Sequence, residues 1–549
     1  MGGAETFFDV LMRHGRAQPD KPAVHQIGGG TLTYAELAKA ATCLRDRFDS
    51  LPAEVRYLPL CMARTGASVA AILAATGTGR SFVCMNQKLR PPQIVEILQA
   101  LQARVVLMDA VGTLALRGWQ ETGVPLDKVD WWVLPGGQWT SLHDRVADGL
   151  TVSVRMDAWV PGDVPVRPPA SPAVGDDMSA CCLFTSGSTG SQKGVRVGRH
   201  DLVSRVEAEV EAFGITEQDV LLGVLPFSFD VGLNQMLVAM RTGATLVLSE
   251  SWLPVDLLKA VAQWKVTGIS GVPSIWTSLV RGGFSFDGDG EHKSLRYITV
   301  SGGDMNAADL SRLREATGKA GIFKTYGQTE AFRSTCLQPD DFDRKPGSVG
   351  RPFADCRVYV VNDKGRPVGA GQEGQVVHTG VGTMLGYFDG DAAAGKLLPN
   401  PYHGASDPHR VAVMTGDQGR LDEEGFLYLL GRRDQMIKIN GNRVYPQGIA
   451  DATAAVPGVA AAEVVTWSGP DGGTRFVAFV VLEGSSSLAA SEMERMLAAR
   501  LPSFMQPSVV QVIPTMPLTA SGKPDRMRLA EMACTVSAGT SGENLTKQG

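Results

Sequence analysis

Short hydrophobic runs rich in β-branched residues alternate along this chain with amphipathic stretches of helical period. The clearest strand-like runs are 105–108, 132–134, 245–248 and 297–300, and the clearest helical stretches are 92–101 and 257–264. Strands that alternate with helices are typical of parallel sheets joined by crossover helices. The pattern therefore predicts an α/β fold with a large layered N-terminal domain.

Towards the C-terminus the hydrophobic pattern becomes more strand-like. Residues 373–387 and 425–430 are β-like and predict a β-rich sub-lobe, after which Gly431-Arg432-Arg433-Asp434 marks a boundary. We expect an N-terminal domain over 1–432 and a small, mobile α+β C-terminal domain over 433–530. Within the latter, 461–466, 475–481 and 509–512 predict strands and 491–500 predicts a helix. The Ser/Thr/Gly-rich residues 531–549 predict a disordered tail, and the Pro-rich residues 161–172 an exposed linker.

The composition of the chain excludes several classes of function. The 549 residues, 44% hydrophobic and 20% charged, are enough for at least two globular domains. A net charge of −5 gives no excess of cations for a phosphate polymer or an anionic bilayer. There is no signal-like start, no apolar run of membrane-spanning length and no cysteine or histidine spacing typical of zinc. We expect a cytoplasmic protein that binds neither nucleic acid nor membrane.

The segment from Thr185 to Gly194 has the chemistry of a phosphate-binding loop. It reads TSGSTGSQKG, in which glycines let backbone N–H groups approach phosphate oxygens, hydroxyls add donors and Lys193 adds a positive charge. The candidate ligands of phosphate are Thr185, Ser186, Gly187, Ser188, Thr189, Gly190 and Lys193. A Walker loop would need Ser or Thr after the lysine, where this chain has Gly194. Taken alone, the segment could equally be a Gly/Ser surface turn.

Four further motifs follow in order. They are Tyr326-Gly327-Gln328-Thr329-Glu330, Thr415-Gly416-Asp417, Gly431-Arg432-Arg433-Asp434 with Lys438, Gly441, Arg443 and Val444, and Ser521-Gly522-Lys523. With the loop at Thr185, these motifs resemble those of the adenylate-forming superfamily of acyl-CoA synthetases, amino-acid adenylation domains and luciferases. The resemblance spans Thr185 to Lys523 and implies an AMP-forming ligase that uses ATP and Mg²⁺.

The resemblance assigns roles that fit the chemistry of each side chain. Thr329 and Glu330 are implied to be catalytic, with a hydroxyl for a phosphate and a carboxylate for Mg²⁺. Tyr326 is expected on the adenine, and Asp417 and Arg432 on the ribose. Gly302, Gly303 and Gly327 complete the implied ATP site. The alternatives are a solvated turn for Asp417 and a surface ion pair for Arg432.

The C-terminal motifs imply two half-reactions. Lys523 matches a mobile catalytic lysine whose ammonium neutralises charge around the attacked α-phosphate. Asp434 matches the hinge of a swinging domain, and Gly441 the small residue beside a pantetheine arm. One departure is that Gln447-Gly448-Ile449-Ala450 replaces an acidic helix start, so the docking surface of the small domain is expected to differ.

The acid pocket is expected to draw on four segments of the chain. The candidates are Phe229, Asp230, Ser274, Ser301, Thr325 and Arg333. Asp230 favours an amino acid, α or β, because a carboxylate inside a pocket needs a positively charged partner. The alternatives are that Asp230 caps a helix and that the substrate is a fatty or aryl acid. Arg333 could meet a second carboxylate of the substrate or Asp230 itself.

The residues after Lys523 are too few for a carrier domain of ~80 residues. We therefore expect the acyl group to pass to the phosphopantetheine thiol of a discrete carrier protein, in a biosynthetic pathway, with coenzyme A as the alternative acceptor. A luciferase-like oxygenase would share the motifs but need a luciferin. An inactive binding protein would be expected to have lost Lys523 or Glu330.

Overall fold

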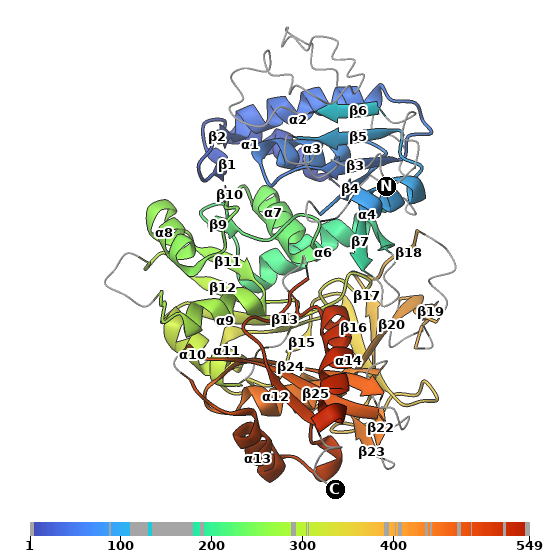
Figure 1. Ribbon diagram of the computed structural model, residues 1–549. Helices are drawn as coiled ribbons and strands as arrows, with labels where there is room; N and C mark the ends of the chain where they lie inside the picture. The colour runs from blue at the N-terminus through green and yellow to red at the C-terminus, as the bar shows by residue number, and fades with distance from the viewer. Residues whose placement is uncertain are drawn as a thin grey trace, which may run out of the picture.

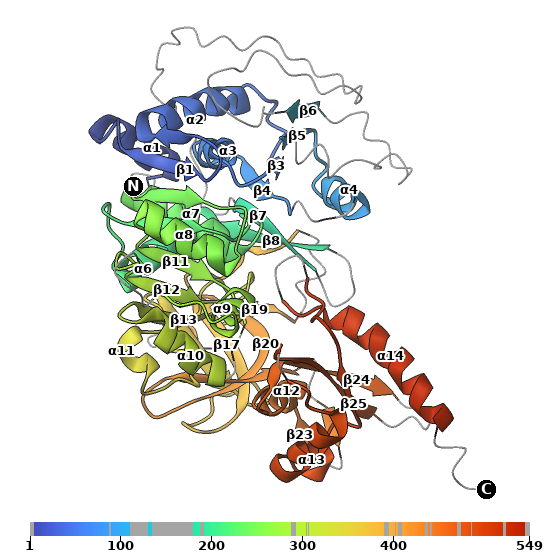
Figure 2. The same ribbon diagram turned by 60° about the vertical axis from the view of Figure 1, so that its left-hand side comes forward.

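The computed structural model shows a large, layered domain with a smaller C-terminal domain beside its lower half (Figures 1 and 2). The structure describes residues 5–86, 89, 91–109, 130–133, 179–186, 192–286, 292–303, 305, 307–388, 395–400, 402–404, 409–433, 437–439, 442–468, 474–484, 486–519 and 523–543. The predicted linker at 161–172 lies outside these residues. No helix within them is long and apolar enough to cross a membrane.

A mainly parallel sheet forms the centre of the large domain. Among the described residues it has nine strands, in the order β15 (Arg351–Pro352), β14 (Thr335–Leu337), β13 (Gly321–Tyr326), β12 (Tyr297–Val300), β11 (Gly268–Gly271), β9 (Val220–Gly223), β10 (Thr245–Leu248), β1 (Pro22–Gln26) and β2 (Thr31–Thr33). The strands from β13 to β1 run parallel. Their carboxyl ends therefore meet at one edge, which is where open α/β sheets bind ligands.

A second sheet lies on the other side of a shared layer of helices. Its described strands, in order, are β18 (Gly386–Tyr387), β8 (Gln192–Gly198), β7 (Ser179–Ser186), β4 (Ser81–Cys84), β3 (Tyr57–Cys61), β5 (Val105–Met108) and β6 (Asp130–Val133). One hydrophobic core joins both sheets to the helices α1 (Phe7–Ala17), α2 (Tyr34–Asp49), α3 (Gly66–Thr76), α6 (Arg199–Phe213) and α7 (Asp230–Thr242). Every residue of α3 is buried, as expected of a helix covered on all sides.

The outer faces of the two sheets are covered by further helices. The nine-stranded sheet packs against α8 (Pro254–Trp264), α9 (Pro273–Arg281), α10 (Ala307–Thr317) and α11 (Pro339–Phe342). The second sheet packs against α4 (Pro91–Ala100). The helices predicted at 92–101 and 257–264 and the strands predicted at 105–108, 245–248 and 297–300 are all present. The strand predicted at 132–134 is β6, which begins earlier, at Asp130.

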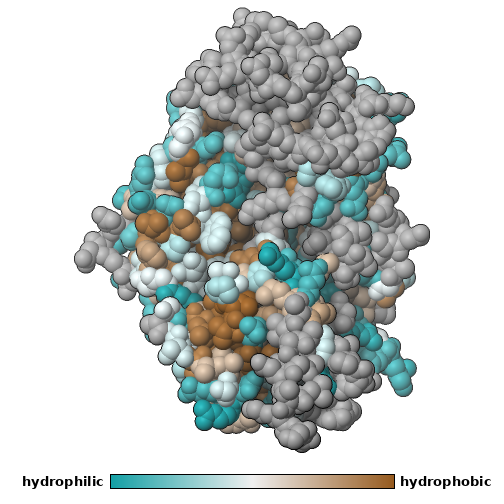
Figure 3. Space-filling view, viewed as in Figure 1, coloured by the Kyte–Doolittle hydropathy of each residue, from teal (hydrophilic) through white to brown (hydrophobic). Residues whose placement is uncertain are grey.

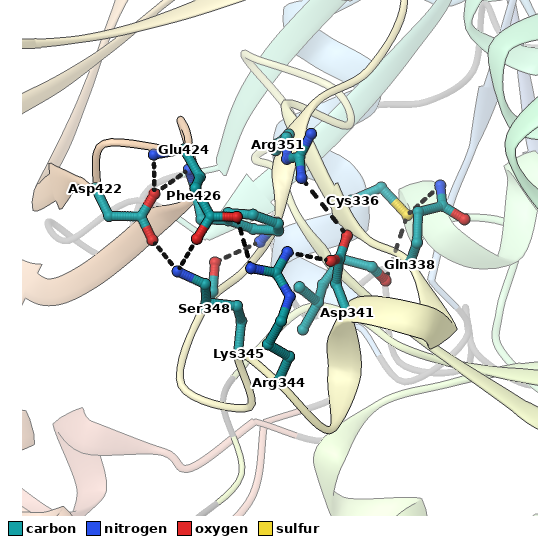
Figure 4. Close-up of polar contacts among 12 residues, drawn as sticks. Cys336, Gln338, Asp341, Arg344, Lys345, Ser348, Arg351, Asp422, Glu424 and Phe426 are labelled. Atoms are coloured by element: carbon teal, nitrogen blue, oxygen red, sulfur yellow. Dashed lines mark hydrogen bonds and ion pairs between the residues drawn. The ribbon is translucent and has the colours of Figure 1, made fainter.

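The predicted β-rich sub-lobe is an antiparallel sheet. Its described strands are β16 (Cys356–Val361), β17 (Gly374–Gly380), β20 (Val411–Leu421) and β19 (Leu397–Pro399), with β21 (Leu427–Arg432) paired to β20. The turn between β20 and β21 is tied to the loop before β15. There the charged groups of Arg344, Lys345 and Arg351 lie 5.3, 5.2 and 4.2 Å from the centre of the buried Phe426 ring. Carboxylates of the same segments pair with these cations (Figure 4), so opposite charges fasten the sub-lobe to the large sheet.

The C-terminal domain is the predicted small α+β unit. Its elements are β22 (Ile437–Ile439), β23 (Asn442–Val444), α12 (Pro446–Ala454), β24 (Val459–Ser468), β25 (Thr474–Leu482), α13 (Ala490–Arg500), a 3₁₀ turn at Ser503–Met505, β26 (Val509–Val512) and α14 (Arg526–Glu543). Strands β24, β25 and β26 form a sheet. A salt bridge of 3.2 Å from Arg312 of α10 to Glu483 links the two domains.

The tail differs from the sequence prediction. Residues 531–549 were expected to be disordered, but α14 continues to Glu543. Leu529, Met532 and Ala533, at helical spacing, pack on Val477 and Phe479 of β25. This apolar face explains why α14 continues past residue 530. The Ser/Thr/Gly content of the later residues concealed it in the sequence.

Candidate active site

The carboxyl edge of the parallel sheet brings together the residues expected in the acid pocket. Asp230 begins α7 after β9, Ser274 lies at the start of α9 after β11, Ser301 follows β12, and Thr325 lies near the end of β13. Gly302 has a φ of +78°, and a Cβ there would come within 3.0 Å of the Phe229 ring. The glycine therefore permits a close approach of the β12 loop to Phe229.

Asp230 is the first residue of α7. Its carboxylate accepts a hydrogen bond of 2.9 Å from the backbone N–H of Val231, and the helix has no side-chain cap. Burial raises the pKa of Asp230, while the charges of Arg333 and Lys523 and the Val231 N–H oppose that shift. Both cations therefore act on this carboxylate. The N-terminal end of the helix favours the same negative charge.

Arg333 is buried at the end of the loop that follows β13. Its Nε donates to Glu209 of α6 at 2.5 Å, and its Nη1 donates to the hydroxyls of Ser301 at 3.0 Å and Thr325 at 2.8 Å. The hydroxyls of Ser301 and Thr325 are themselves 2.7 Å apart. These contacts fix the guanidinium among the expected pocket residues. Arg333 and Asp230, both described, form no ion pair with each other.

Two residues expected to contact ATP, Tyr326 and Arg432, converge with Gln328 on the carboxylate of a third, Asp417. Asp417, in β20, accepts hydrogen bonds of 2.5 Å from the Tyr326 hydroxyl and 2.5 Å from the Gln328 amide, and its other oxygen lies 3.3 Å from Arg432 Nη1. Arg432 and Asp417 are also register partners across β20 and β21. Burial raises the pKa of Asp417, opposed by Arg432 and the two hydrogen bonds. Gln328 is an addition to the expected set, although it lies within the Tyr326–Glu330 motif.

Glu330 lies in the same loop and has two partners that no sequence motif indicated. One carboxylate oxygen accepts a 2.6 Å hydrogen bond from the Tyr387 hydroxyl and lies 3.3 Å from Lys396 Nζ. Burial alone would raise the pKa of Glu330, but Lys396 and Tyr387 outweigh it and lower the pKa. The neighbouring Thr329 is half-buried. Glu330 is thus ionised and suited to a hard cation such as Mg²⁺, which proteins often bind through one or two carboxylates and substrate phosphates.

The segment expected to bind phosphate begins in β7 and ends in β8. Thr185 pairs with Lys193 across these two strands, and Ser186 pairs with Gln192. Lys193 Nζ lies 6.0 Å from the centre of the Tyr387 ring, so the end of the loop approaches the tyrosine that binds Glu330. Gly187, Ser188, Thr189 and Gly190, the tip of the loop, lie outside the described residues.

Lys523, from the C-terminal domain, lies near Phe229, one of the residues expected in the acid pocket. Its Nζ lies 5.8 Å from the centre of the Phe229 ring, and its charge acts on Asp230. The backbone N–H of Thr519 donates to the Lys523 carbonyl at 2.7 Å, which closes the turn that presents the lysine. Two motif residues, Asp434 and Gly441, lie outside the described residues.

A cavity of about 480 Å³ adjoins the pocket. Its lining includes Ser228, Val272 and Ser274 from the sheet edge, and Leu518 and Thr519 from the loop that carries Lys523. Trp252 also lines it and is 37% exposed at the surface near the start of α8. On the face seen in Figure 3, hydrophobic residues are interspersed with hydrophilic ones over the part that carries α8. The loop of Lys523 thus forms part of the wall of this cavity, together with Ser274 of the expected acid pocket.

Sequence reasoning missed Lys396, Tyr387 and Glu209. Tyr387 and Lys396 lie on either side of residues 389–394, in a stretch without a motif, and Glu209 lies in a helix with several other charges. Only the three-dimensional arrangement brings them to Glu330 and Arg333. The departure at Gln447 also has a structural role, because its amide oxygen accepts a hydrogen bond of 3.0 Å from Arg526 at the start of α14.

Known proteins resemble the chain over nearly its whole length. The family profile described as AMP-binding enzyme matches residues 11–388, and that of the AMP-binding enzyme C-terminal domain matches 449–523. Phosphinothricin tripeptide synthetase PhsC of Streptomyces viridochromogenes is 29% identical over 532 residues, which are 96% of this chain and 45% of that protein. Bacitracin synthase 3 of Bacillus licheniformis is 29% identical over 371 residues, which are 67% of this chain and 6% of the synthase. The chain therefore spans less than half the length of either relative.

Two other known proteins are matched by this chain over most of their own length. The 2-succinylbenzoate–CoA ligase of Bacillus velezensis is 31% identical over 358 residues, which are 65% of this chain and 69% of the ligase. The solved structure of the amide bond synthetase McbA from Marinactinospora thermotolerans superposes with a TM-score of 0.80 at 23% identity, covering 96% of this chain and 99% of McbA. This chain belongs to the AMP-binding enzyme family and is an adenylate-forming ligase of that superfamily.

Proposed function

We propose that this ligase uses ATP and Mg²⁺ to activate the carboxyl group of a small amino acid, α or β. The observation that carries the proposal is the position of Lys523 beside Phe229, where its charge acts on Asp230. A substrate ammonium at Asp230 would compensate that carboxylate, and the substrate carboxyl group would then face the lysine. A fatty acid would leave Asp230 without such a partner.

The residues of the site would divide the first half-reaction between them. A substrate carboxylate oxygen forms a bond to the α-phosphorus of ATP, and pyrophosphate leaves. Lys523 stabilises the charge that develops there, while Lys193 and the phosphate loop hold the phosphates and Thr329 adds a hydroxyl. Tyr326, Asp417 and Arg432 hold the nucleoside, with Gly302, Gly303 and Gly327 allowing its close approach. Mg²⁺ at Glu330 would supply charge screening of the triphosphate.

For the second half-reaction we propose transfer to the phosphopantetheine thiol of a carrier protein supplied in trans. The cavity supports this route, because Ser274 of the expected acid pocket and Leu518 and Thr519 of the Lys523 loop line it together, and movement of this loop about a hinge at Asp434 would open it. Gly441 would then approach the arm. The thiol sulfur bonds to the acyl carbon, and AMP leaves.

Coenzyme A is the second candidate acceptor. It is favoured by the similarity to 2-succinylbenzoate–CoA ligase, of which this chain covers a larger share than it does of the tripeptide synthetase. Mass spectrometry can separate the two candidates when ATP and a substrate acid are supplied with either coenzyme A or a phosphopantetheinylated carrier protein. We expect an acyl-carrier thioester. Efficient formation of acyl-CoA, with none on carrier proteins, would favour the second candidate.

The choice of acid is tested at Asp230. Exchange of pyrophosphate into ATP should be faster with an amino acid than with the matched acid that lacks nitrogen, by roughly a hundredfold, the scale of a buried ion pair. Asp230→Asn keeps the shape of the side chain and should remove most of this difference. Equal use of the deaminated acid by the unaltered protein would make Asp230 structural and favour a fatty or aryl substrate.

A further inference from the structure

Lys396 holds its ammonium group among three oxygen atoms at the expected ATP site. Its Nζ lies 3.3 Å from Oε1 of Glu330, 3.2 Å from the amide oxygen of Gln328 and 3.4 Å from the backbone carbonyl oxygen of Thr415. A carboxylate together with amide and backbone carbonyl oxygens is a ligand set typical of a hard cation. The ammonium group therefore lies where the site offers its oxygen atoms to a cation.

Lys396 is held more loosely than the other partner of Glu330. Hydrogen bonds from an ammonium group to a carboxylate are usually about 2.7–2.9 Å long. The contact of Lys396 is 3.3 Å, whereas the hydroxyl of Tyr387 donates to the same oxygen at 2.6 Å. The lysine side chain is also 24% exposed. Tyr387 is therefore the fixed partner of Glu330, and Lys396 is the exchangeable one.

The backbone of Lys396 is fixed although its ammonium group is not. Its carbonyl oxygen accepts a hydrogen bond of 2.8 Å from the backbone N–H of Met414 in β20, and β19 begins at the next residue. The four-carbon stem of a lysine is flexible and carries its charge at the end. The ammonium group can therefore change partners by rotation of the side chain, without a change in the sheet.

Gln328 places the lysine between the two carboxylates that are expected to bind the nucleotide. The amide nitrogen of Gln328 donates to Asp417, the expected ligand of the ribose, at 2.5 Å, and its amide oxygen faces Lys396. Glu330, the expected ligand of Mg²⁺, is another partner of the same ammonium group. In ATP the phosphates connect the ribose to the bound Mg²⁺, and Lys396 lies along that path.

Mg²⁺ and the ammonium group compete for Glu330. A carboxylate oxygen has two lone pairs, and at Oε1 these are taken by Tyr387 and Lys396. Two cations at one carboxylate also repel each other, an effect that is stronger away from bulk water. A divalent cation that binds through Oε1 therefore requires the ammonium group to leave.

We propose that Lys396 occupies the cation position at Glu330 in the nucleotide-free protein and turns to the phosphates when Mg²⁺ and ATP bind. This inference rests on the proposed role of Glu330 as the ligand of Mg²⁺. In the first state, Lys396 balances the charge of the carboxylate. In the second state, the carboxylate binds Mg²⁺ instead, and Lys396 becomes a further ligand of the triphosphate.

Metal binding to the nucleotide-free protein tests the first state. The probe is Mn²⁺, whose free concentration is measured by electron paramagnetic resonance at neutral pH. Lys396→Met should bind Mn²⁺ about fivefold more tightly than the wild type, or more, because the ammonium group no longer competes. Lys193→Met is the matched control, because Lys193 and Glu330, both described, form no ion pair. It should change the affinity by about twofold or less, since a more distant charge is screened.

Nucleotide binding tests the second state. Calorimetry gives the dissociation constants of ATP with Mg²⁺ and of adenosine, without any acid. Lys396→Met should weaken the binding of ATP with Mg²⁺ by about 10-fold or more, the scale of one charge-assisted hydrogen bond. Its affinity for adenosine, which has no phosphate, should be that of the wild type. Lys396→Gln, which keeps a hydrogen-bond donor and removes the charge, should behave as Lys396→Met does.

The opposite signs of the two effects separate this inference from other roles of Lys396. A lysine that only stabilises the site would weaken both Mn²⁺ and ATP binding when it is removed, and one that only repels cations would strengthen both. Either result, no gain in Mn²⁺ affinity in Lys396→Met, or an equal gain in Lys193→Met would overturn the inference.

A further variant separates this inference from the proposed function. If Glu330→Gln binds Mn²⁺ as tightly as the wild type, the proposed metal site falls and the inference falls with it. The preference for an amino acid is measured separately at Asp230, so its failure would leave the role of Lys396 standing.

Discussion

The two carboxylates nearest the expected nucleotide site differ in their partners. Burial raises the pKa of Asp417 in spite of Arg432 and its two hydrogen bonds. For Glu330 the effect of burial is outweighed by Lys396 and Tyr387, which lower its pKa. Glu330 is therefore the better ligand for a divalent cation over a wide range of pH, and Lys396 is central to that property.

Removal of Lys396 should shift the acid limb of the pH profile of pyrophosphate exchange. Lysine lowers the pKa of Glu330, so Lys396→Met raises it, and the carboxylate becomes protonated at a higher pH. Exchange measured against pH at fixed Mg²⁺ should then begin to decline at higher pH than in the wild type. Lys396→Arg, which keeps the charge, is the control. An acid limb that does not move would show that Glu330 does not limit the rate there.

The motif residues of the candidate site could be predicted from the sequence. The side chains that pair with them could not. Tyr326, Asp417 and Arg432 were expected at one nucleotide site, and the structure brings them into contact. Lys396 and Glu209 lie in segments whose local sequence resembles any charged surface. A long-range partner leaves no periodicity or spacing in the sequence, so only the fold brings these residues to the site.

At the scale of elements, hydrophobic patterning was sufficient for strands with at least one face packed against another layer. Strands β5, β10, β12 and β26 begin and end at the predicted residues, because their side chains lie in sheets packed on other layers. α14 was missed because a narrow apolar face was enough to dock it on β25, while its overall composition is that of a tail. The pairing and register of the strands could not be predicted either, because they depend on contacts between residues distant in sequence.

An ion pair contributes to the junction of α14 with β24. Arg526 Nε lies 2.6 Å from Glu463, a buried carboxylate whose pKa is raised by burial in spite of this partner. Arg526→Met should lower the free energy of unfolding of the C-terminal domain by about 1–3 kcal/mol, less than for a fully buried pair because the arginine is partly exposed. Urea denaturation at pH 7 measures the change.

A second variant and a change of pH test whether the unpaired carboxylate of Glu463 causes this loss of stability. Adding Glu463→Gln to Arg526→Met should restore most of the lost stability, because no charge is then left buried. Lowering the pH should also reduce the defect of the single variant as Glu463 becomes protonated. A defect that persists in the double variant and at low pH would mean that Arg526 acts through packing or through Gln447.

At the scale of the whole molecule, the C-terminal domain is seen in the orientation that brings Lys523 to the Phe229 ring. Arg312 and Glu483 link the domains on an exposed edge, at 3.2 Å. Such pairs contribute about 1 kcal/mol or less, so Arg312→Glu should reduce adenylation by at most about fivefold. The exchanged pair, Arg312→Glu with Glu483→Arg, should recover the rate. No effect of either variant would show that this contact does not select the orientation.

The central claim is that adenylation takes place where Lys523 meets the carboxyl edge of the parallel sheet. Its most direct test is acid-dependent exchange of pyrophosphate into ATP by the wild type, by Lys523→Ala and by Arg528→Ala, an exposed cation five residues away. The wild type and Arg528→Ala should exchange equally. Lys523→Ala should be slower by ~10²-fold or more, the scale of one preorganised electrostatic contact, yet still transfer the acyl group from a supplied acyl-adenylate to a thiol. Undiminished exchange by Lys523→Ala would contradict the account.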